Sequence, residues 1–273
     1  MEQNISLVKA VETGDYEIAR SMLEAGADPD IGDGEGKTPL LSAVILGDLS
    51  FVKLLLSYHA DPFYSGFHDM PVLMASAFFG HLELVTYFID MGFDLLNIRS
   101  SWGDTSLIYA SKRNHPSIVR FLLGSGADVH VRNCYGISPI LAAANQGNAE
   151  CCHLLLAYGA LPNDCDNLGR SVLRHAVRAR VDKKLIGALI GSGADPLIRD
   201  RKGHSIFWEN LPVSYLRIIL DYYRVYSEGR ELRPEEVRSR IISFRKEGRE
   251  PLETLTCKKK ASRKIRSWRQ GTR

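Results

Sequence analysis

The sequence predicts an all-α fold: a solenoid of about seven helix–turn–helix repeats, followed by a basic, partly helical C-terminal tail. Two signals recur with a spacing of 33 or 34 residues, which is the length of one repeated supersecondary element. The first signal is a turn, mostly Gly-Ala-Asp, that begins at Gly26, His59, Gly92, Gly126, Gly159 and Gly193. The second is a Thr, Ser or Pro just before an apolar run, at Thr38, Pro71, Thr105, Ser138, Ser171 and Ser205.

Each repeat contains two short helices, as the second repeat illustrates. Thr38 can cap the free amides of a first helix that runs to Gly47, with the small Ala43 where neighbouring helices approach closely. A second helix follows over 48–58, and the glycine or histidine of the next turn can end it in a left-handed conformation. The apolar stripe of this helix has helical spacing and consists of Phe51, Val52, Leu55 and Leu56.

The two ends of the array differ from its middle, because the terminal repeats of a solenoid face water on one side. Residues 4–27 form a helix pair without a preceding loop, and residues 204–226 form the last repeat. A long second helix is predicted there over 214–227. Its residues for packing are Leu216, Ile219, Leu220 and Tyr223. We therefore divide the chain into a repeat domain, 1–226, and a tail, 227–273.

The repeat pattern is similar to that of a known family. The period, the Thr-Pro-Leu helix start at Thr38, the central Gly47 and the Gly-Ala-Asp-Pro turn at Gly26 resemble ankyrin repeats over roughly residues 1–226. The family has a histidine after Thr-Pro-Leu that ties the helix start to the loop, and here those positions hold Leu41, Met74, Ile108, Leu141, Arg174 and Trp208. The resemblance implies a groove, lined by loop tips and first-helix ends, that binds partner proteins.

The residues that differ between repeats indicate a candidate partner-binding surface. Aromatic and basic side chains gather at the loop tips and first-helix ends in the middle of the array, namely Phe78, Phe79, Trp102, Lys112, Arg113 and Tyr135. Exposed aromatic rings beside arginine are typical of interface hot spots. We expect the four rings to lie close together, flanked by the two basic residues. In the alternative interpretation the phenylalanines pack under the neighbouring loop and the tyrosine covers backbone.

The sequence offers no catalytic pattern. Cys151, Cys152 and His153 are metal-ligand types, but no second pair follows at the spacing of a zinc site. The two cysteines fall where Phe51 and Val52 fall in the second repeat, on the buried face of a second helix, so we interpret them as core residues. Phosphate-binding glycine loops, nucleophile elbows and His-Glu-x-x-His motifs are absent. We expect a chain that is not an enzyme and has neither a metal nor another cofactor.

The compartment follows from the cysteines and from hydropathy. The five cysteines are odd in number and show no disulfide framework, which favours a reducing, intracellular location. No apolar run approaches the roughly 18 residues that indicate a membrane span. The amino terminus lacks the apolar core of a secretory signal. We expect a cytoplasmic or nuclear protein.

The formal net charge of +3 conceals two segments of opposite sign. Residues 228–273 carry 15 Lys+Arg and 7 Asp+Glu, a net of +8, whereas the first 227 residues carry a net of −5. Because no basic field covers the array, we do not expect it to bind nucleic acid. In the tail, Pro234 and the acids after it predict a helix that ends at Gly248, and a second helix is predicted after Pro251.

Three interpretations of the tail remain open. The first is a two-part nuclear import signal, which the basic clusters resemble: Arg245, Lys246, Lys258, Lys259 and Lys260. The second is a degraded SOCS box, which the segment after Pro251 resembles through Leu252, Leu255, Cys257 and Ile265. That resemblance implies binding of elongin B/C, although the downstream Leu-Pro-x-Pro segment does not follow. The third is a solvated basic extension that contacts nucleic acid, acidic proteins or anionic membrane.

Taken together, these patterns predict a non-catalytic protein–protein interaction module or adaptor that binds a partner protein through its groove. The alternative function is a substrate-receptor subunit of a cullin-type ubiquitin ligase, reached through the SOCS-like tail.

Overall fold

The structure is a computed structural model that describes residues 6–63, 70–92, 95–209, 211–227, 230–231, 236–237, 239, 241–243 and 256–259. Contacts divide the chain into two compact units, 1–134 and 135–273, which we call the N-terminal unit and the C-terminal unit.

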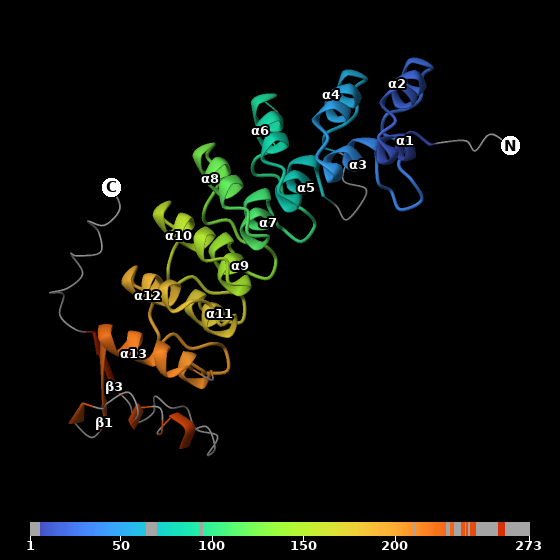
Figure 1. Ribbon diagram of the computed structural model, residues 1–273. Coiled ribbons are helices and arrows are strands. Elements are labelled where there is room, and N and C mark those ends of the chain that lie inside the picture. The colour runs from blue at the N-terminus through green and yellow to red at the C-terminus, as the bar shows by residue number, and fades with distance from the viewer. Residues whose placement is uncertain are drawn as a thin grey trace. The chain divides into compact units, whose positions relative to one another are not determined.

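The described part of the N-terminal unit contains four consecutive helix pairs. The first helices contact one another in sequence and form one row, and the second helices lie beside them as a second row (Figure 1). The pairs are α1 (Leu7–Thr13) with α2 (Tyr16–Glu24), α3 (Pro39–Leu46) with α4 (Leu49–Ser57), α5 (Val72–Phe79) with α6 (Leu82–Asp90), and α7 (Ser106–Lys112) with α8 (Pro116–Gly124).

The described part of the C-terminal unit continues the same pattern. Two further pairs are α9 (Pro139–Gln146) with α10 (Ala149–Ala157), and α11 (Val172–Arg178) with α12 (Lys183–Gly191). In the last repeat the 3₁₀ helix η1 (Ile206–Trp208) takes the place of a first helix and contacts α11, while α13 (Val213–Tyr222) packs on α12. The prediction of about seven helical repeats is confirmed.

Side-chain caps and left-handed residues set the helix ends where the sequence predicts them. The Thr38 hydroxyl accepts the amide hydrogen of Leu41 at 3.1 Å, and Ser171 caps α11 in the same way through Arg174 N. At the end of the second helices, His59 adopts the left-handed conformation that glycine takes in the other repeats, with a φ of 67°. The turn therefore requires this conformation even where the residue has a Cβ.

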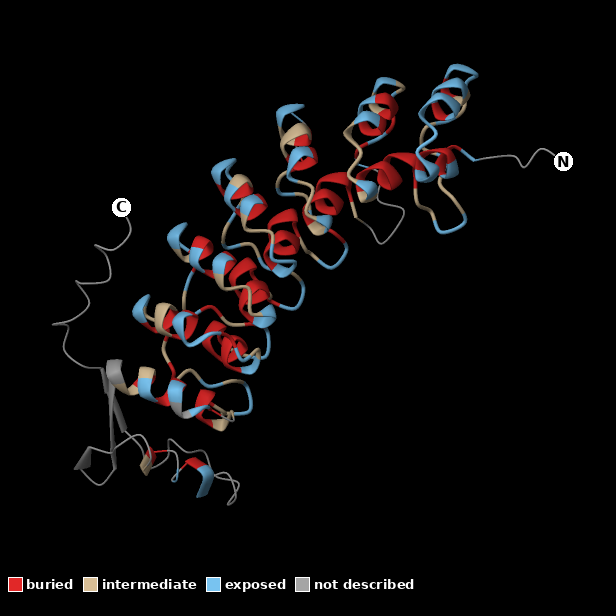
Figure 2. Cartoon of the chain, in the orientation of Figure 1, coloured by how far each residue is buried: buried red, intermediate tan, exposed pale blue. Residues whose placement is uncertain are grey.

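The core of each unit lies along its first helices. Leu40, Leu73 and Leu107 are at most 1% exposed, and the small Ala43 is fully buried where helices meet. The second helices bury one face only, so their outer sides remain exposed (Figure 2). Each repeat thus buries its apolar surface against its neighbours, which is why a single repeat would not be stable alone.

The end of the last repeat and the tail each depart from the prediction at one place. The helix predicted over 214–227 ends at Tyr222, and residues 223–227 form strand β1 (Tyr223–Ser227). The prediction of a helix after Pro251 is wrong for residues 256–259, because these residues form strand β3 (Thr256–Lys259). β1 pairs antiparallel with β3 on one side and with β2 (Arg230–Glu231) on the other. The two tyrosines and the β-branched Val225 of β1 favour a strand, and the pairing satisfies backbone groups that a short helix would leave to water.

The tail helix that was predicted to begin at Pro234 and end at Gly248 is confirmed in part. Residues 236–237, 239 and 241–243 are helical, and Val237 and Ile241, which are four residues apart and so share a helix face, are buried. Its predicted end at Gly248 lies outside the described residues. In the part of the chain that the structure describes, no helix is both long and apolar enough to cross a bilayer.

Candidate partner-binding surfaces

The end of α5 carries two phenylalanines that meet the end of α7. Phe78 is half-buried and packs edge-on against Phe79, with ring centroids 5.0 Å apart, and against Tyr109 of α7 at 5.6 Å. Phe79 is 41% exposed. Phe78 therefore packs on the neighbouring repeat and Phe79 presents its ring to solvent, while binding of a partner by these residues stays a prediction.

Arginine completes this surface. The guanidinium carbon of Arg113 lies 4.4 Å from the centroid of the Phe78 ring, which is the geometry of a cation–π contact. Lys112 precedes it on the last turn of α7, and both basic residues are exposed. We define the α5–α7 surface as Phe78, Phe79, Lys112 and Arg113. It combines an aromatic pair with one guanidinium held over it, and Lys112 adds a second exposed positive charge at the end of α7.

A histidine from the next repeat fixes the backbone under the α5–α7 surface. His115 Nε2 lies 3.1 Å from the carbonyl oxygen of Phe78, and His81 makes the same contact to Ile45 one repeat earlier at 3.0 Å. Gly80 leaves room for this ring, because a Cβ there would lie 2.5 Å from His115 Cε1. These contacts link α3 and α5 to the helix pair that follows each of them.

Replacing His115 with alanine should lower the free energy of unfolding by about 1 kcal/mol, since the Phe78 carbonyl loses its partner in a half-buried position. Urea denaturation followed by circular dichroism would measure the change. His130 is exposed in the same unit, and His130→Ala should stay within roughly 0.5 kcal/mol of the unmodified chain. Equal stability of the two variants would show that the inter-repeat contact contributes nothing.

Two aromatic residues of the candidate surface lie on loop tips, Trp102 in the N-terminal unit and Tyr135 in the C-terminal unit. Trp102 is 55% exposed on the loop before α7, and its carbonyl oxygen accepts the amide hydrogen of Cys134 at 2.9 Å. Tyr135 is 57% exposed in the C-terminal unit, where its carbonyl oxygen accepts the amide hydrogen of Asn167 at 3.0 Å. In both cases the backbone is tied to the next loop while the ring faces water. The expected approach of Tyr135 to the other three rings stays a prediction.

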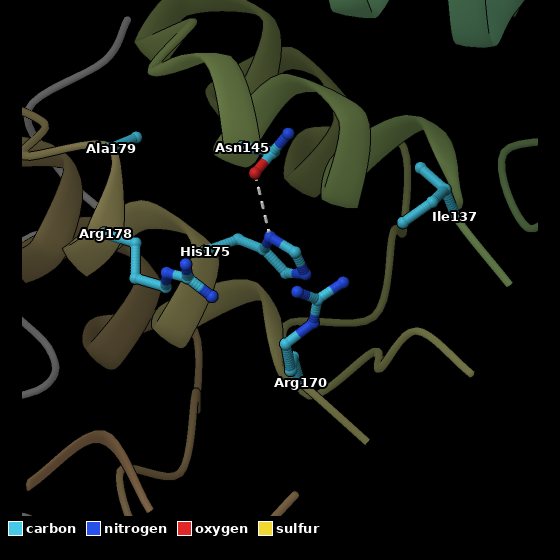
Figure 3. Close-up of a pocket in the computed structure, with 6 residues that line it drawn as sticks. All are labelled: Ile137, Asn145, Arg170, His175, Arg178 and Ala179. Atoms are coloured by element: carbon cyan, nitrogen blue, oxygen red, sulfur yellow. Dashed lines mark hydrogen bonds between the residues drawn. The ribbon is translucent and has the colours of Figure 1, made fainter. Parts of the chain in front are cut away.

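The C-terminal unit contains a pocket that the sequence did not lead us to predict. It has a volume of about 400 Å³ and is lined by Ile137, Asn145, Arg170, His175, Arg178 and Ala179 (Figure 3). His175 is 4% exposed, and its Nδ1 and Nε2 lie 3.1 Å from Asn145 Oδ1 and from Asp166 Oδ2. The Nε2 hydrogen is donated to the Asp166 carboxylate, and Nδ1 contacts the side-chain amide group of Asn145, so the two contacts orient the ring.

Asp166 is the centre of this polar network. Its side chain is 1% exposed and accepts hydrogen bonds from the Leu168 and Arg170 amides, from Arg170 Nε at 2.7 Å, and from His175. Burial by itself raises the pKa of Asp166, but the hydrogen bonds from Arg170 and His175 outweigh it and hold the pKa below its ordinary value. Burial lowers the pKa of His175, although the Asp166 carboxylate opposes that effect.

One sequence signal could have pointed to this pocket. The position of His175 in the repeat holds Ser42, Ala75, Tyr109 and Ala142 elsewhere, so a titratable side chain replaces small or aromatic ones at a buried position. The pattern of one repeat does not show what it contacts, because Asn145 comes from the preceding repeat.

The cysteines predicted to be core residues are buried. Cys151 and Cys152 are fully inaccessible on α10, and burial raises their pKa values to about 11 and about 12. His153, between them and Leu154, is exposed. The two thiols therefore pack as small apolar groups.

The tail residues singled out from the sequence lie mostly outside the described part of the chain. Of the import candidates, Lys258 and Lys259 are on β3, while Arg245, Lys246 and Lys260 are not described, so nuclear import stays a prediction. Of the SOCS-like residues, Cys257 is on β3, and the others, Leu252, Leu255 and Ile265, are not described. The helix that a SOCS box requires at Cys257 is replaced by a strand, because β1 supplies a pairing partner for this segment.

Charge separates the two compact units more sharply than it separates array from tail. The N-terminal unit carries 9 Lys+Arg and 17 Asp+Glu, a net of −8, and the C-terminal unit carries 26 and 15, a net of +11. The net of −5 over the first 227 residues therefore averages an acidic unit and a basic stretch of repeats.

Comparison with known proteins identifies a family model and a solved structure that are similar to this chain. The family model described as ankyrin repeats (3 copies) matches residues 3–65, 64–133 and 107–200. The ankyrin repeat domain of Bcl-3, titled a unique member of the IkappaB protein family, is similar in structure, with a TM-score of 0.67 and 25% identity; the match covers 80% of this chain and 99% of that one.

Two curated relatives match over shorter stretches. A putative ankyrin repeat-containing protein of Treponema pallidum is 31% identical over 133 residues, which are 48% of this chain and 44% of that protein. The glycerophosphocholine phosphodiesterase GDE1 of Candida albicans is 40% identical over 81 residues, or 29% of this chain and 7% of that enzyme. The chain thus spans less than half the length of either relative. The family match, the helix pairs and their caps lead to one conclusion: the chain belongs to the ankyrin repeat family.

Proposed function

We propose that the chain is a non-catalytic adaptor that binds a partner protein through the α5–α7 surface. The observation that carries the proposal is the arrangement of Phe78, Phe79 and Arg113. The half-buried Phe78 ring packs on Tyr109, the Phe79 ring is exposed, and the Arg113 guanidinium lies over Phe78. Ankyrin repeats in general bind proteins, and membership of this family supports a role in protein binding without catalysis.

The physical advantage of this surface is that little has to be ordered on binding. Phe78 is held from three directions, by Phe79, Tyr109 and Arg113, and its carbonyl is held by His115. An aromatic platform that is rigid before association loses little side-chain entropy when a partner covers it. Aromatic and arginine side chains are also those that most often dominate the binding energy of interfaces.

An apolar or aromatic segment of the partner is the expected ligand of Phe79. The N-terminal unit is acidic overall, with a net of −8, whereas the exposed Lys112 and Arg113 put two positive charges at the end of α7. The local charge opposes that of the unit as a whole, so a segment that combines an aromatic or aliphatic residue with an acid would fit here better than elsewhere on the unit.

Replacing Phe79 with alanine should weaken partner binding roughly tenfold or more, as for a hot-spot aromatic, with little effect on folding. Proximity labelling with the full chain would compare partners captured by the unmodified chain, by Phe79→Ala and by Met91→Ala. Met91 is a matched control because it is 48% exposed at the end of α6, outside the α5–α7 surface.

Thermal denaturation of the same three chains separates binding from stability. A selective loss of partners for Phe79→Ala at an unchanged melting temperature would support the proposal. A fall in melting temperature that parallels the loss of partners would contradict it, since Phe79 would then act as a core residue. Turnover of any substrate by the pure chain would contradict the non-catalytic part of the proposal.

A further inference from the structure

The pocket of the C-terminal unit has a surplus of positive charge on its rim. Arg170 and Arg178 both line it, and in Figure 3 both guanidinium groups point toward His175 from different sides. Arg170 donates its Nε hydrogen to Asp166, so its charge is partly balanced. Arg178 is exposed at the end of α11 and makes no ion pair with any residue in the described ranges.

The sum of charges around the pocket is close to +1 at neutral pH. Asp166 is ionised, since its pKa lies below the ordinary value of 3.8, and His175 is neutral, since burial takes its pKa below 6.5. Two arginines and one carboxylate remain. A single carboxylate would neutralise this surplus, whereas a phosphate group, with about −1.5 to −2 charges, would exceed it.

The geometry of the lining suits a side chain that carries a carboxylate. Guanidinium groups bind carboxylates through paired N–H donors in one plane. Ile137 and Ala179 give the pocket an apolar wall that can contact methylene groups, and a volume of about 400 Å³ exceeds the space that one carboxylate side chain needs. Because contacts at both ring nitrogens orient His175, this part of the lining is in place before a ligand arrives.

The position of the pocket in the repeat also favours a peptide ligand. Asn145, Arg178 and Ala179 stand at the same repeat positions as Phe78 and Phe79, just before the central glycine or its substitute. A partner segment that lies along first-helix ends would thus meet this pocket by the same mode of binding. The net charge of +11 on the C-terminal unit attracts an acidic segment over a longer range.

We propose that this pocket binds the carboxylate of a glutamate or aspartate side chain from a partner peptide, clamped between Arg170 and Arg178. The assignment rests on the proposed function only for the source of the carboxylate, a protein partner. The pocket itself can be tested without that partner.

The test is an NMR titration of the full chain with N-acetyl-glutamic acid methylamide, observed at the arginine Nε–Hε signals. A saturable shift of the Arg178 signal is expected. Arg178→Gln should raise the dissociation constant at least tenfold, and because Arg178 is exposed this variant should fold normally, which its melting temperature would check. Arg201→Gln, a matched exposed arginine outside the pocket, should leave the dissociation constant unchanged.

Two further ligands test which chemical group the pocket binds. The neutral analogue N-acetyl-glutamine methylamide should give no saturable shift, and an equal shift with it would overturn the proposal. Tighter binding of N-acetyl-phosphoserine methylamide would overturn the choice of a carboxylate. Absence of any shift with the glutamate analogue would overturn the pocket as a site. The Phe79→Ala experiment does not involve these residues, so the proposed function and this inference can fail independently.

Discussion

Replacing Arg174 with methionine is expected to destabilise the C-terminal unit by about 3–5 kcal/mol, because it leaves buried carboxylates without their counter-charge. The Arg174 side chain is 8% exposed and donates to Asp200 Oδ2 at 2.6 Å, to Glu209 Oε1 at 2.8 Å and to the His204 carbonyl oxygen at 3.0 Å. Asp200 is equally buried, and Glu209 is 21% exposed.

Urea denaturation at pH 7 would measure this loss. Arg178→Met is the matched control, since Arg178 lies one turn further along the same helix, is exposed and makes no ion pair among the described residues; its effect should stay within roughly 0.5 kcal/mol. A change below about 1 kcal/mol for Arg174→Met would contradict the view that this cluster holds the last repeat.

The cluster also explains one departure from the family pattern. Arg174 occupies the position where ankyrin repeats carry the histidine that ties the helix start to the loop. Its guanidinium reaches the following loop at Asp200 and the end of η1 at Glu209, so a longer side chain provides the same kind of link. Burial by itself raises the pKa of Asp200, but the His204 amide and the Arg174 charge together hold the pKa below its ordinary value.

The second large effect is expected for Asp166→Ala. This change removes the acceptor of two backbone amides, of Arg170 Nε and of His175 Nε2, and leaves the buried His175 ring without one of its two partners. Because the Asp166 side chain is 1% exposed, water cannot replace these contacts, and we expect a loss of about 3–5 kcal/mol.

Asp33 offers a matched control in the first loop. It holds the same repeat position and accepts hydrogen bonds from the Glu35 and Lys37 amides at 2.9 and 3.0 Å, but its side chain is 29% exposed. Asp33→Ala should therefore lose the turn contacts and a partly exposed ion pair with Lys37 at 3.8 Å, together about 1–2 kcal/mol. Equal losses for the two variants would show that the buried network around His175 adds no stability.

Acid should weaken the same network in two steps. The pKa of His175 is lower in the folded state than its ordinary 6.5, so the unfolded chain binds a proton more readily and stability begins to fall as the pH drops below 6.5. The pKa of Asp166 is also lowered, so its contribution is present above 3.8 and is lost as the pH falls through the folded value. In Asp166→Ala the second step should be smaller in urea titrations at several pH values, and a part should remain because the pKa of Asp200 is lowered as well.

The repeat fold was predictable because its determinants are local and recur. A cap such as Thr38, a left-handed turn such as His59 and a helical apolar stripe each act within one repeat of 33 or 34 residues, so the same signals appear along the chain. The burial of Cys151 and Cys152 followed from the same register. The paired strands of the tail were not predictable in this way, since β1 and β3 are separated in sequence and each needs the other to form.

The functional surfaces were predictable only in part. Phe79 and Arg113 stood out because they vary between repeats, and the structure adds that Arg113 lies over Phe78, the neighbour of Phe79. The pocket around His175 was missed because its members come from two successive repeats and are brought together by packing.

The sequence by itself therefore determined the repeat length, the helix pairs and their caps, because these depend on residues within a turn or two of one another. The tertiary structure decided where the compact units divide, and with that boundary the opposite charges of −8 and +11 become visible. It also decided which polar groups are buried together, as for Arg174 with Asp200 and His175 with Asp166. Such pairs form only when neighbouring repeats stack and exclude water, a physical condition that no single repeat contains.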